Sequence, residues 1–382
     1  MVAATGYAPI SLTLDNVPAS GAVATNALLT AMLRANNQVS DLIFSPGRPP
    51  QVEINGQLVP VEARGLRPLL ADDTRRIAAD LIGSNKPAIT MLREQGSCDI
   101  SYGLPGLARF RVNVFIQRGS CAVVMRVIPT SIPDFSSLGV PQTLGEIADL
   151  RDGIVLVTGG RGSGKSSTLA AILDRINQTR TCHIITIEDP IEFLHNHKQA
   201  TVHQREVHSD APSYTQALRS ALRQAPNVIL VGEIRDRETI EMAFEAAETG
   251  HLVLSTLNTV NAVQTIERIV NAFSGVEQKG IRTRLARTLR RVISQRLIPR
   301  IDGSGRVAVV ELLKVNARAC EYLEQGARLD ETIPHLIKQG RSDGMQDFDS
   351  AIAELVLSGV AAEDTALIYS SDPTELRRLL QQ

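Results

Sequence analysis

One glycine-rich segment constrains this chain more than any other. It consists of Gly159, Gly160, Arg161, Gly162, Ser163, Gly164, Lys165, Ser166 and Ser167, and it fits the pattern G-x-x-x-x-G-K-[ST]. Glycines allow backbone N–H groups to turn inward around phosphate oxygens, and the lysine ammonium can reach the outer phosphates. The next hydroxyl, that of Ser166, can bind Mg²⁺. An apolar run at 154–157 and an amphipathic stretch at 167–178 predict a flanking strand and helix, and together they indicate a nucleoside triphosphate site.

The composition limits the alternatives. The 382 residues are enough for about two domains. A net charge of -1 and an aromatic content of 3% disfavour nucleic acid as a partner. The apolar runs are shorter than the ~18 residues of a membrane span, and there is no signal-peptide pattern. The four cysteines are scattered without a C-x-x-C pair, so we expect a cytoplasmic protein with reduced thiols.

The first third of the chain predicts a small domain. Residues 1–23 are small and polar without a period, and we interpret them as a mobile leader. Residues 24–132 form the predicted α+β domain, with helices expected at 25–40 and 71–82 and strands at 108–117 and 122–128.

The rest of the chain predicts a larger α/β domain. Residues 133–143 are expected to be a linker, and the domain itself covers 144–382. Strands are expected at 183–187, 228–231 and 252–256; they alternate with helical stretches, which indicates a parallel sheet with helices on both faces. The connection 192–213 should be a loop that contains several histidines without a metal-ligand pattern. Residues 301–382 should be mostly short helices.

Acidic residues follow two of the predicted strands. Glu233 ends an apolar strand at the Walker B position, where Gly232 replaces the usual aspartate. We expect Glu233 to activate the attacking water or to hold the metal's water shell. Glu188 and Asp189 end another strand. Ligand groups gather at the carboxyl ends of parallel strands, so these carboxylates should converge beside the phosphate loop.

Two further features have open interpretations. His251 precedes the strand at 252–256 and could sense the γ-phosphate, although a lone histidine is more often a packing residue. Between 277 and 302 there are seven arginines and no acid, with apolar residues at helical spacing. This pattern predicts either a helix that binds nucleic acid or membrane or, as we favour, a core-facing helix whose basic side is used between subunits.

Taken together, these motifs resemble the type IV pilus and type II secretion traffic ATPases, and most of all the PilT/PilU-like retraction ATPases. The resemblance covers about residues 25–350 and rests on the phosphate loop and on the stretches IEDPIEFLH, RQAPNVILVGEIRDRETI, AAETGHLVLSTLNT, RFRVNVF and GMQDFD. It implies a RecA-like core behind a PAS-like domain. It also implies a cytoplasmic, hexameric ATPase that works with ATP and Mg²⁺ at an inner-membrane pilus platform protein, with a paralogous motor as a further partner.

The resemblance also assigns roles. Glu188 and Asp189 correspond to the family's Asp box, and His251 to the first histidine of its His box. Arg111 and Arg126 lie where the family has arginines that reach into a neighbour's nucleotide site; such a cation can neutralise charge on the transferred phosphoryl group.

The sequence departs from the family in three places. Asn258 stands at the second His-box histidine, Gly160-Arg161 replaces the usual Pro-Thr, and residues 316–325 do not match the retraction-type segment. The tetra-cysteine site of the assembly-type relatives is absent, which favours the retraction branch. Two alternatives stay open: an accessory or weakly catalytic ring ATPase, and a hexameric nucleic-acid translocase.

Overall fold

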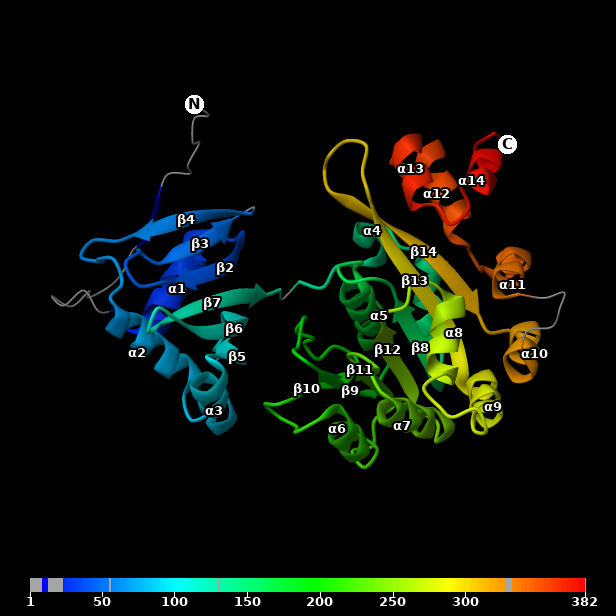
Figure 1. Cartoon of the computed structure of the whole chain (residues 1–382), viewed down its shortest axis with the longest axis horizontal. Coiled ribbons are helices and arrows are strands. Elements are labelled where there is room, and N and C mark those ends of the chain that lie inside the picture. The colour runs from blue at the N-terminus through cyan, green and yellow to red at the C-terminus, as the bar shows by residue number, and fades with distance from the viewer. Residues whose placement is uncertain (1–8, 13–22, 55, 130, 327–331, 382) are drawn as a thin grey trace. The chain divides into compact units, whose positions relative to one another are not determined.

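The computed structural model describes residues 9–12, 23–54, 56–129, 131–326 and 332–381. The chain divides into two compact units, Met1–Thr130 and Ser131–Gln382 (Figure 1).

The first unit is a seven-stranded sheet with helices packed on one face. Its strands are β1 (Ile10–Ser11), β2 (Val39–Phe44), β3 (Gln51–Ile54), β4 (Gln57–Glu62), β5 (Ser97–Leu104), β6 (Ala108–Gln117) and β7 (Ser120–Ile128), in the order β1-β4-β3-β2-β7-β6-β5. The helices are α1 (Thr25–Ala35), α2 (Ala71–Ile82) and α3 (Lys86–Gln95). Side chains alternate between the two faces along each strand. In β6, Phe110, Val112 and Val114 are fully buried on one face, whereas Arg111 on the other face is exposed.

Two predictions for this unit are corrected. Residues 10–11 of the predicted mobile leader form β1, which pairs with β4, and Leu12 N donates to Glu62 O at 2.7 Å. Residues 1–8 and 13–22 of that leader lie outside the described residues. The helix expected to reach residue 40 ends at Ala35, because two asparagines follow and the β-branched Val39 already belongs to β2.

The second unit contains another seven-stranded sheet, in the order β10-β9-β11-β12-β8-β13-β14. Its strands are β8 (Gly153–Thr158), β9 (His183–Glu188), β10 (Thr201–Glu206), β11 (Val228–Val231), β12 (Leu252–Leu257), β13 (Leu289–Pro299) and β14 (Arg306–Lys314). All neighbours pair in parallel except β13 and β14, which are antiparallel. A parallel α/β fold with one antiparallel strand at the edge therefore holds the phosphate loop.

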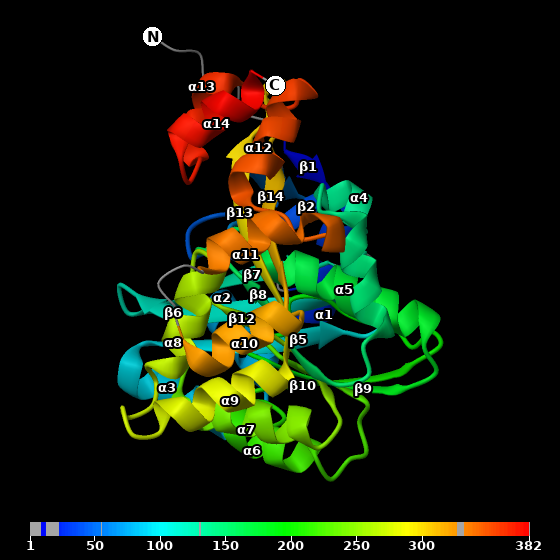
Figure 2. The same cartoon turned by 90° about the vertical axis from the view of Figure 1, so that its right-hand side faces the viewer.

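Helices cover both faces of this sheet (Figures 1 and 2). One face packs against α4 (Phe135–Leu138), the 3₁₀ helix Gln142–Asp149 and α5 (Lys165–Thr179). The other packs against α6 (Tyr214–Ala221), α7 (Arg237–Glu248), α8 (Ala262–Val270), α9 (Gln278–Thr288), α10 (Ala317–Gln325) and α11 (Ile333–Gln339). The 3₁₀ turn Gly340–Asp343 follows, and α12 (Phe348–Leu357), α13 (Glu363–Tyr369) and α14 (Pro373–Leu380) form a C-terminal cluster with β13 and β14. Burial on both faces explains why the central strands are continuous apolar runs.

The structure corrects several predictions for the second unit. The predicted linker at 133–143 is largely part of the core, because Phe135 and Val140 are buried against the cluster around α5. The basic stretch is not one helix: α9 ends at Thr288, and Val292 and Ile293 lie on β13 and pack on opposite faces of the sheet. A run of adjacent apolar residues is compatible with a strand that is buried on both faces as well as with a helix, so the pattern alone does not distinguish them.

Two further segments contain strands that the sequence did not reveal. The connection at 192–213 includes β10, which pairs along β9, so His203 lies on a strand rather than a loop. The region after residue 301 begins with the strand β14 before its helices. Both strands are at the edges of the sheet. The polar composition of β10 gives little apolar signal, whereas β14 is a continuous buried run at 307–313.

Candidate functional site

The phosphate loop connects the carboxyl end of β8 to the first turn of α5. Gly159, Gly162 and Gly164 have φ angles of 150°, 74° and 87°. A Cβ atom at Gly159 would lie 2.4 Å from the carbonyl oxygen of Gln295, and one at Gly164 would lie 2.7 Å from Gln295 Nε2. The glycines are therefore required both by the backbone conformation and by the close approach of β13.

Gln295 of β13 packs against the phosphate loop and the first turns of α5. It is buried, and its Oε1 accepts a hydrogen bond of 2.7 Å from Thr168 Oγ1 in α5. The sequence pattern does not reveal Gln295, because the arginine-rich stretch at 277–302 predicts a helix. Only the pairing of β13 with β8 brings it under the loop.

The loop has the polar groups that a phosphate requires. Ser163 Oγ is buried, and within the described part of the chain it has no hydrogen-bond partner. Lys165 Nζ donates to the carbonyl oxygens of Gly159 and Gly160, both at 2.9 Å. Burial lowers the pKa of Lys165, and Glu233 and Glu192 oppose that change. An unsatisfied buried hydroxyl in a cradle without Cβ atoms fits a phosphate group.

Three other predicted loop residues lie at its solvent side. Arg161 is exposed, whereas Ser166 and Ser167 in the first turn of α5 are partly exposed. The hydroxyl of Ser166 is thus accessible at the positive end of the helix, where an anion and its cation can bind.

Both carboxylate oxygens of Glu233 are held. Asn258 Nδ2 donates to Oε1 at 2.5 Å, and Arg235 Nε donates to Oε2 at 2.8 Å. The Glu233 side chain is 22% exposed, so water can still reach it. Asn258 thus contacts the acid directly as a neutral donor, whose charge does not change with pH.

Glu188 is held at the end of β9. Its Oε1 accepts from Thr186 Oγ1 at 2.6 Å and from Gln204 Nε2 of β10 at 3.1 Å. Burial raises the pKa of Glu188 despite these hydrogen bonds. The neighbouring Asp189 is partly exposed.

These groups lie along the side of the sheet formed by the carboxyl ends of its parallel strands, called the carboxyl edge below; the opposite side is the amino edge. β9, β11, β12 and β8 are consecutive neighbours, and their carboxyl ends carry Glu188, Glu233, Asn258 and the phosphate loop. Three steps between strands correspond to about 14 Å across the edge. The structure therefore brings the predicted acids to the loop's side, and it places Asn258, named above at the second His-box position, in contact with Glu233. The signal for Asn258 was its place directly after a parallel strand, the same signal that identified Glu233.

His251 lies at the opposite edge. It precedes β12, whose first residue, Leu252, pairs with Gly153 at the start of β8. Six residues of strand, or about 20 Å, separate it from the phosphate loop of its own chain. Its Nδ1 is 2.9 Å from the carbonyl oxygen of Ala246 and 3.1 Å from Thr249 Oγ1. The expectation that it senses the γ-phosphate there is wrong within one chain, because a residue before a parallel strand lies at the amino edge.

Arg111 and Arg126 belong to the first unit. They are directly opposite each other on β6 and β7, and both are exposed. Arg126 Nε donates to Asp41 Oδ1 at 3.0 Å.

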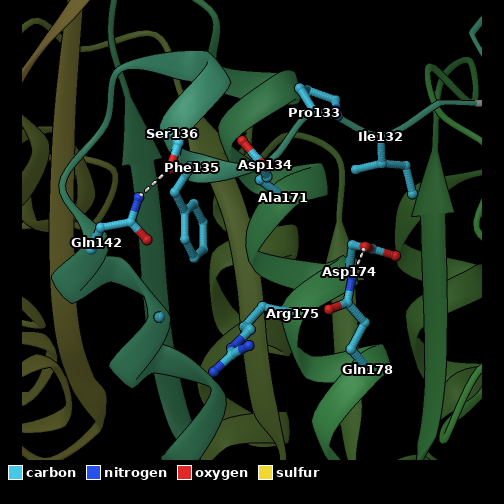
Figure 3. A pocket seen from close by; sticks show the side chains of 11 residues that line it. Ile132, Pro133, Asp134, Phe135, Ser136, Gln142, Ala171, Asp174, Arg175 and Gln178 are labelled. Carbon is cyan, nitrogen blue, oxygen red and sulfur yellow. Dashed lines mark hydrogen bonds between the residues drawn. The ribbon is translucent and has the colours of Figure 1, made fainter.

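A separate pocket of about 310 Å³ lies between residues 132–136 and the middle of α5 (Figure 3). Phe135 forms part of its wall, and Asp174 and Arg175 line it from α5. Asp174 already binds Lys198 Nζ at 2.7 Å. No residue of the phosphate loop lines this pocket, so we do not assign it to the nucleotide.

Comparison with known proteins agrees with this geometry. Residues 99–346 match the family described as Type II/IV secretion system protein. The chain is 42% identical to the type IV pilus retraction ATPase PilT of Pseudomonas aeruginosa, over 87% of this chain and 94% of that protein. It is 37% identical to the type IV pilus ATPase PilU of the same organism, over 90% and 88%.

A solved structure of the pilus retraction motor PilT with bound ADP is similar over 93% of this chain and 98% of that one, with a TM-score of 0.80 and 40% identity. No helix in the described ranges is long and apolar enough to cross a membrane. The fold, the loop and the matched length lead to one assignment: the chain belongs to the type II/IV secretion system ATPase family, and within it the chain is similar to the pilus retraction proteins.

Proposed function

We propose that this protein is a ring-forming, ATP-hydrolysing motor that drives type IV pilus retraction, and with it twitching motility, through a platform protein at the inner membrane. The observation that carries the proposal is Glu233, held through both oxygens on the phosphate-loop side of the sheet. Hydrolysis of a phosphoanhydride requires such an oriented base beside a phosphate cradle. The similarity to two pilus ATPases, PilT and PilU, supports the biological role.

The residues present fit ATP with Mg²⁺. The glycine cradle and the buried Ser163 hydroxyl would accept the phosphates, and the Ser166 hydroxyl would bind the cation. The cation supplies neutralisation of the charge on the β- and γ-phosphates. Glu233 would accept the proton of the attacking water, while Lys165 would hold the phosphate oxygens. No group of three or more His, Cys, Asp or Glu residues in the described ranges could bind a metal, which suits a cation bound largely through phosphate and water.

Arg111 and Arg126 would complete the active site of a neighbouring subunit. Directly opposed like charges on neighbouring strands destabilise a sheet, so such a pair is expected where function requires it. The salt bridge to Asp41 holds Arg126 in a defined direction. We propose six subunits, as the family resemblance implies, and force produced by a changing angle between the two units. The hinge would lie before residue 135, because residues 135–149 are largely packed on the core.

Turnover of Mg-ATP by the oligomer tests this proposal. We expect Glu233→Gln and Arg111→Ala each to lower turnover about a hundredfold or more, because each removes a group that acts on the transition state. The control is Arg75→Ala, which removes an exposed arginine of the same unit as Arg111; among the described residues, its ion pair is with Asp72 on its own helix. Mixed rings of the two inactive variants should recover activity, since a site with Glu233 can then receive Arg111 from its neighbour.

The other outcomes separate the alternatives. Binding of ATP without turnover in the wild type would contradict the motor and favour the accessory ring subunit. Turnover stimulated by DNA would favour the translocase. Mixed rings that stay inactive would exclude an arginine shared between subunits.

A further inference from the structure

Gly232 occupies the position where Walker B motifs have an aspartate, and the backbone does not explain the glycine. Gly232 is absent from the residues with positive φ, so a side chain is compatible with its conformation. The obstacle is one neighbour. A Cβ atom at Gly232 would lie 3.0 Å from the hydroxyl oxygen of Tyr214, closer than its 3.4 Å distances to Glu188 Cα and Ile187 O. The tyrosine hydroxyl therefore lies directly beside the position that the Cβ atom of an aspartate would take.

Tyr214 is fixed in this position by its helix and its ring. It is the first residue of α6, whose N-terminus is capped by Ser213 Oγ, which accepts from Gln216 N at 3.2 Å. The aromatic ring packs against the hydrophobic cluster between the sheet and helices α6–α11. A ring held in the core leaves its hydroxyl as the polar end that faces the site.

The hydroxyl lies among the charged groups of the site. Burial is the main cause that raises the pKa of Tyr214. The negative charges of Asp189, Glu188 and Glu233 raise this pKa further, and the positive charge of Arg235 opposes the rise. The phenol therefore keeps its proton throughout the physiological range. It can donate one hydrogen bond to a carboxylate and accept another from a water molecule.

We propose that the Tyr214 hydroxyl replaces the absent Walker B aspartate as a positioning residue, by accepting a hydrogen bond from a water molecule of the Mg²⁺ hydration shell. This inference rests on the proposed function, since it requires a nucleotide with Mg²⁺ in the phosphate loop. It accounts for the loss of the carboxylate: the site keeps an oxygen at that place, but a neutral one. A hydroxyl accepts more weakly than a carboxylate, so the cation is bound less tightly than an aspartate would allow.

The test measures binding rather than turnover. A fluorescent ADP analogue is titrated against the oligomer at increasing MgCl₂ and also in EDTA. For Tyr214→Phe, which removes only the hydroxyl, we expect the Mg²⁺ concentration at half-maximal enhancement of binding to rise about five- to tenfold, as for the loss of one hydrogen bond. Affinity in EDTA should be unchanged. Tyr322→Phe is the matched control, because this tyrosine of α10 packs against the same hydrophobic cluster outside the site.

A second variant restores the carboxylate. Gly232→Asp has room only when the hydroxyl is gone, so Tyr214→Phe/Gly232→Asp should return the Mg²⁺ midpoint to the wild-type value or below it. An unchanged midpoint in Tyr214→Phe would overturn the inference, and so would a loss of affinity in EDTA, which would reveal a purely structural role. Failure of the wild type to bind the ADP analogue under any condition would instead overturn the proposed function.

Discussion

The two edges of the second unit's sheet are built from the same strands but differ in content. At the carboxyl edge, Glu188, Glu233 and Asn258 follow three neighbouring strands, and Glu188 and Glu233 each accept two side-chain hydrogen bonds. At the amino edge, His251 closes the turn after α7 through the carbonyl of Ala246. Strand direction, more than residue type, therefore decides which polar side chains reach the phosphate loop.

The largest expected effect comes from a charge at the carboxyl edge. Asn258→Asp would replace the amide donor, 2.5 Å from Glu233 Oε1, with a second carboxylate. Two carboxylates in contact cannot both ionise easily, so one pKa rises and the base is lost. We expect ATP turnover at pH 8 to fall about a hundredfold, with partial recovery towards pH 6 as the pair takes up a proton.

Asn258→Ala is the control for this substitution, because it removes the donor without adding charge. Its loss of turnover should be about tenfold and independent of pH. Equal losses for the two substitutions at pH 8 would show that Asn258 acts only through its hydrogen bond, and the electrostatic part of the comparison would then be wrong.

A smaller effect concerns stability. Burial raises the pKa of Glu188, so the folded state holds this proton more tightly than the unfolded state. Its contribution to stability therefore falls as the pH rises above the ordinary value of about 4.3. Glu188→Gln removes the charge and keeps an acceptor for Thr186 and Gln204. We expect the variant to unfold about 2–4 °C above the wild type at pH 7.5, with no difference near pH 4.

Thermal unfolding at the two pH values measures this effect. Glu238→Gln, which changes an exposed glutamate of α7, serves as the control and should shift neither midpoint. A lower melting temperature for Glu188→Gln at pH 7.5 would mean that the ionised carboxylate stabilises the folded protein, contrary to the burial argument.

The smallest effect is expected at the amino edge. His251→Ala removes the contacts to Ala246 and Thr249, so the free energy of unfolding should fall by about 0.5–1 kcal/mol. ATP turnover should change less than twofold, because the imidazole lies a strand's length from the loop. A loss comparable to that of Asn258→Ala, measured under the same conditions, would place His251 at a neighbour's site and would break the contrast between the edges.

Local pattern was sufficient for the centre of the site. The glycines and Lys165 are consecutive, and the backbone they require depends on residue type alone. Glu188 and Glu233 follow apolar runs, so a parallel sheet brings them to one edge whatever the remaining contacts are. The amphipathic pattern at 167–178 is also local, and it predicted α5 within two residues of its bounds, Lys165–Thr179. The error at His251 had another source: its position before the strand at 252–256 was predicted correctly, but a residue before a parallel strand lies at the amino ends of the strands, away from the phosphate loop.

Neighbouring residues alone specify the phosphate loop, the strands and helix around it, and the acids at the strand ends. The tertiary structure decided what supports and completes them. Gln295 lies 127 residues from its partner Thr168, and Asn258 lies 25 residues from Glu233. Tyr214 fills the space beside Gly232 only because α6 packs beneath the carboxyl ends of β9 and β11. Such contacts depend on which strands pair, and that is settled by burying both faces of the sheet, a property of the whole chain.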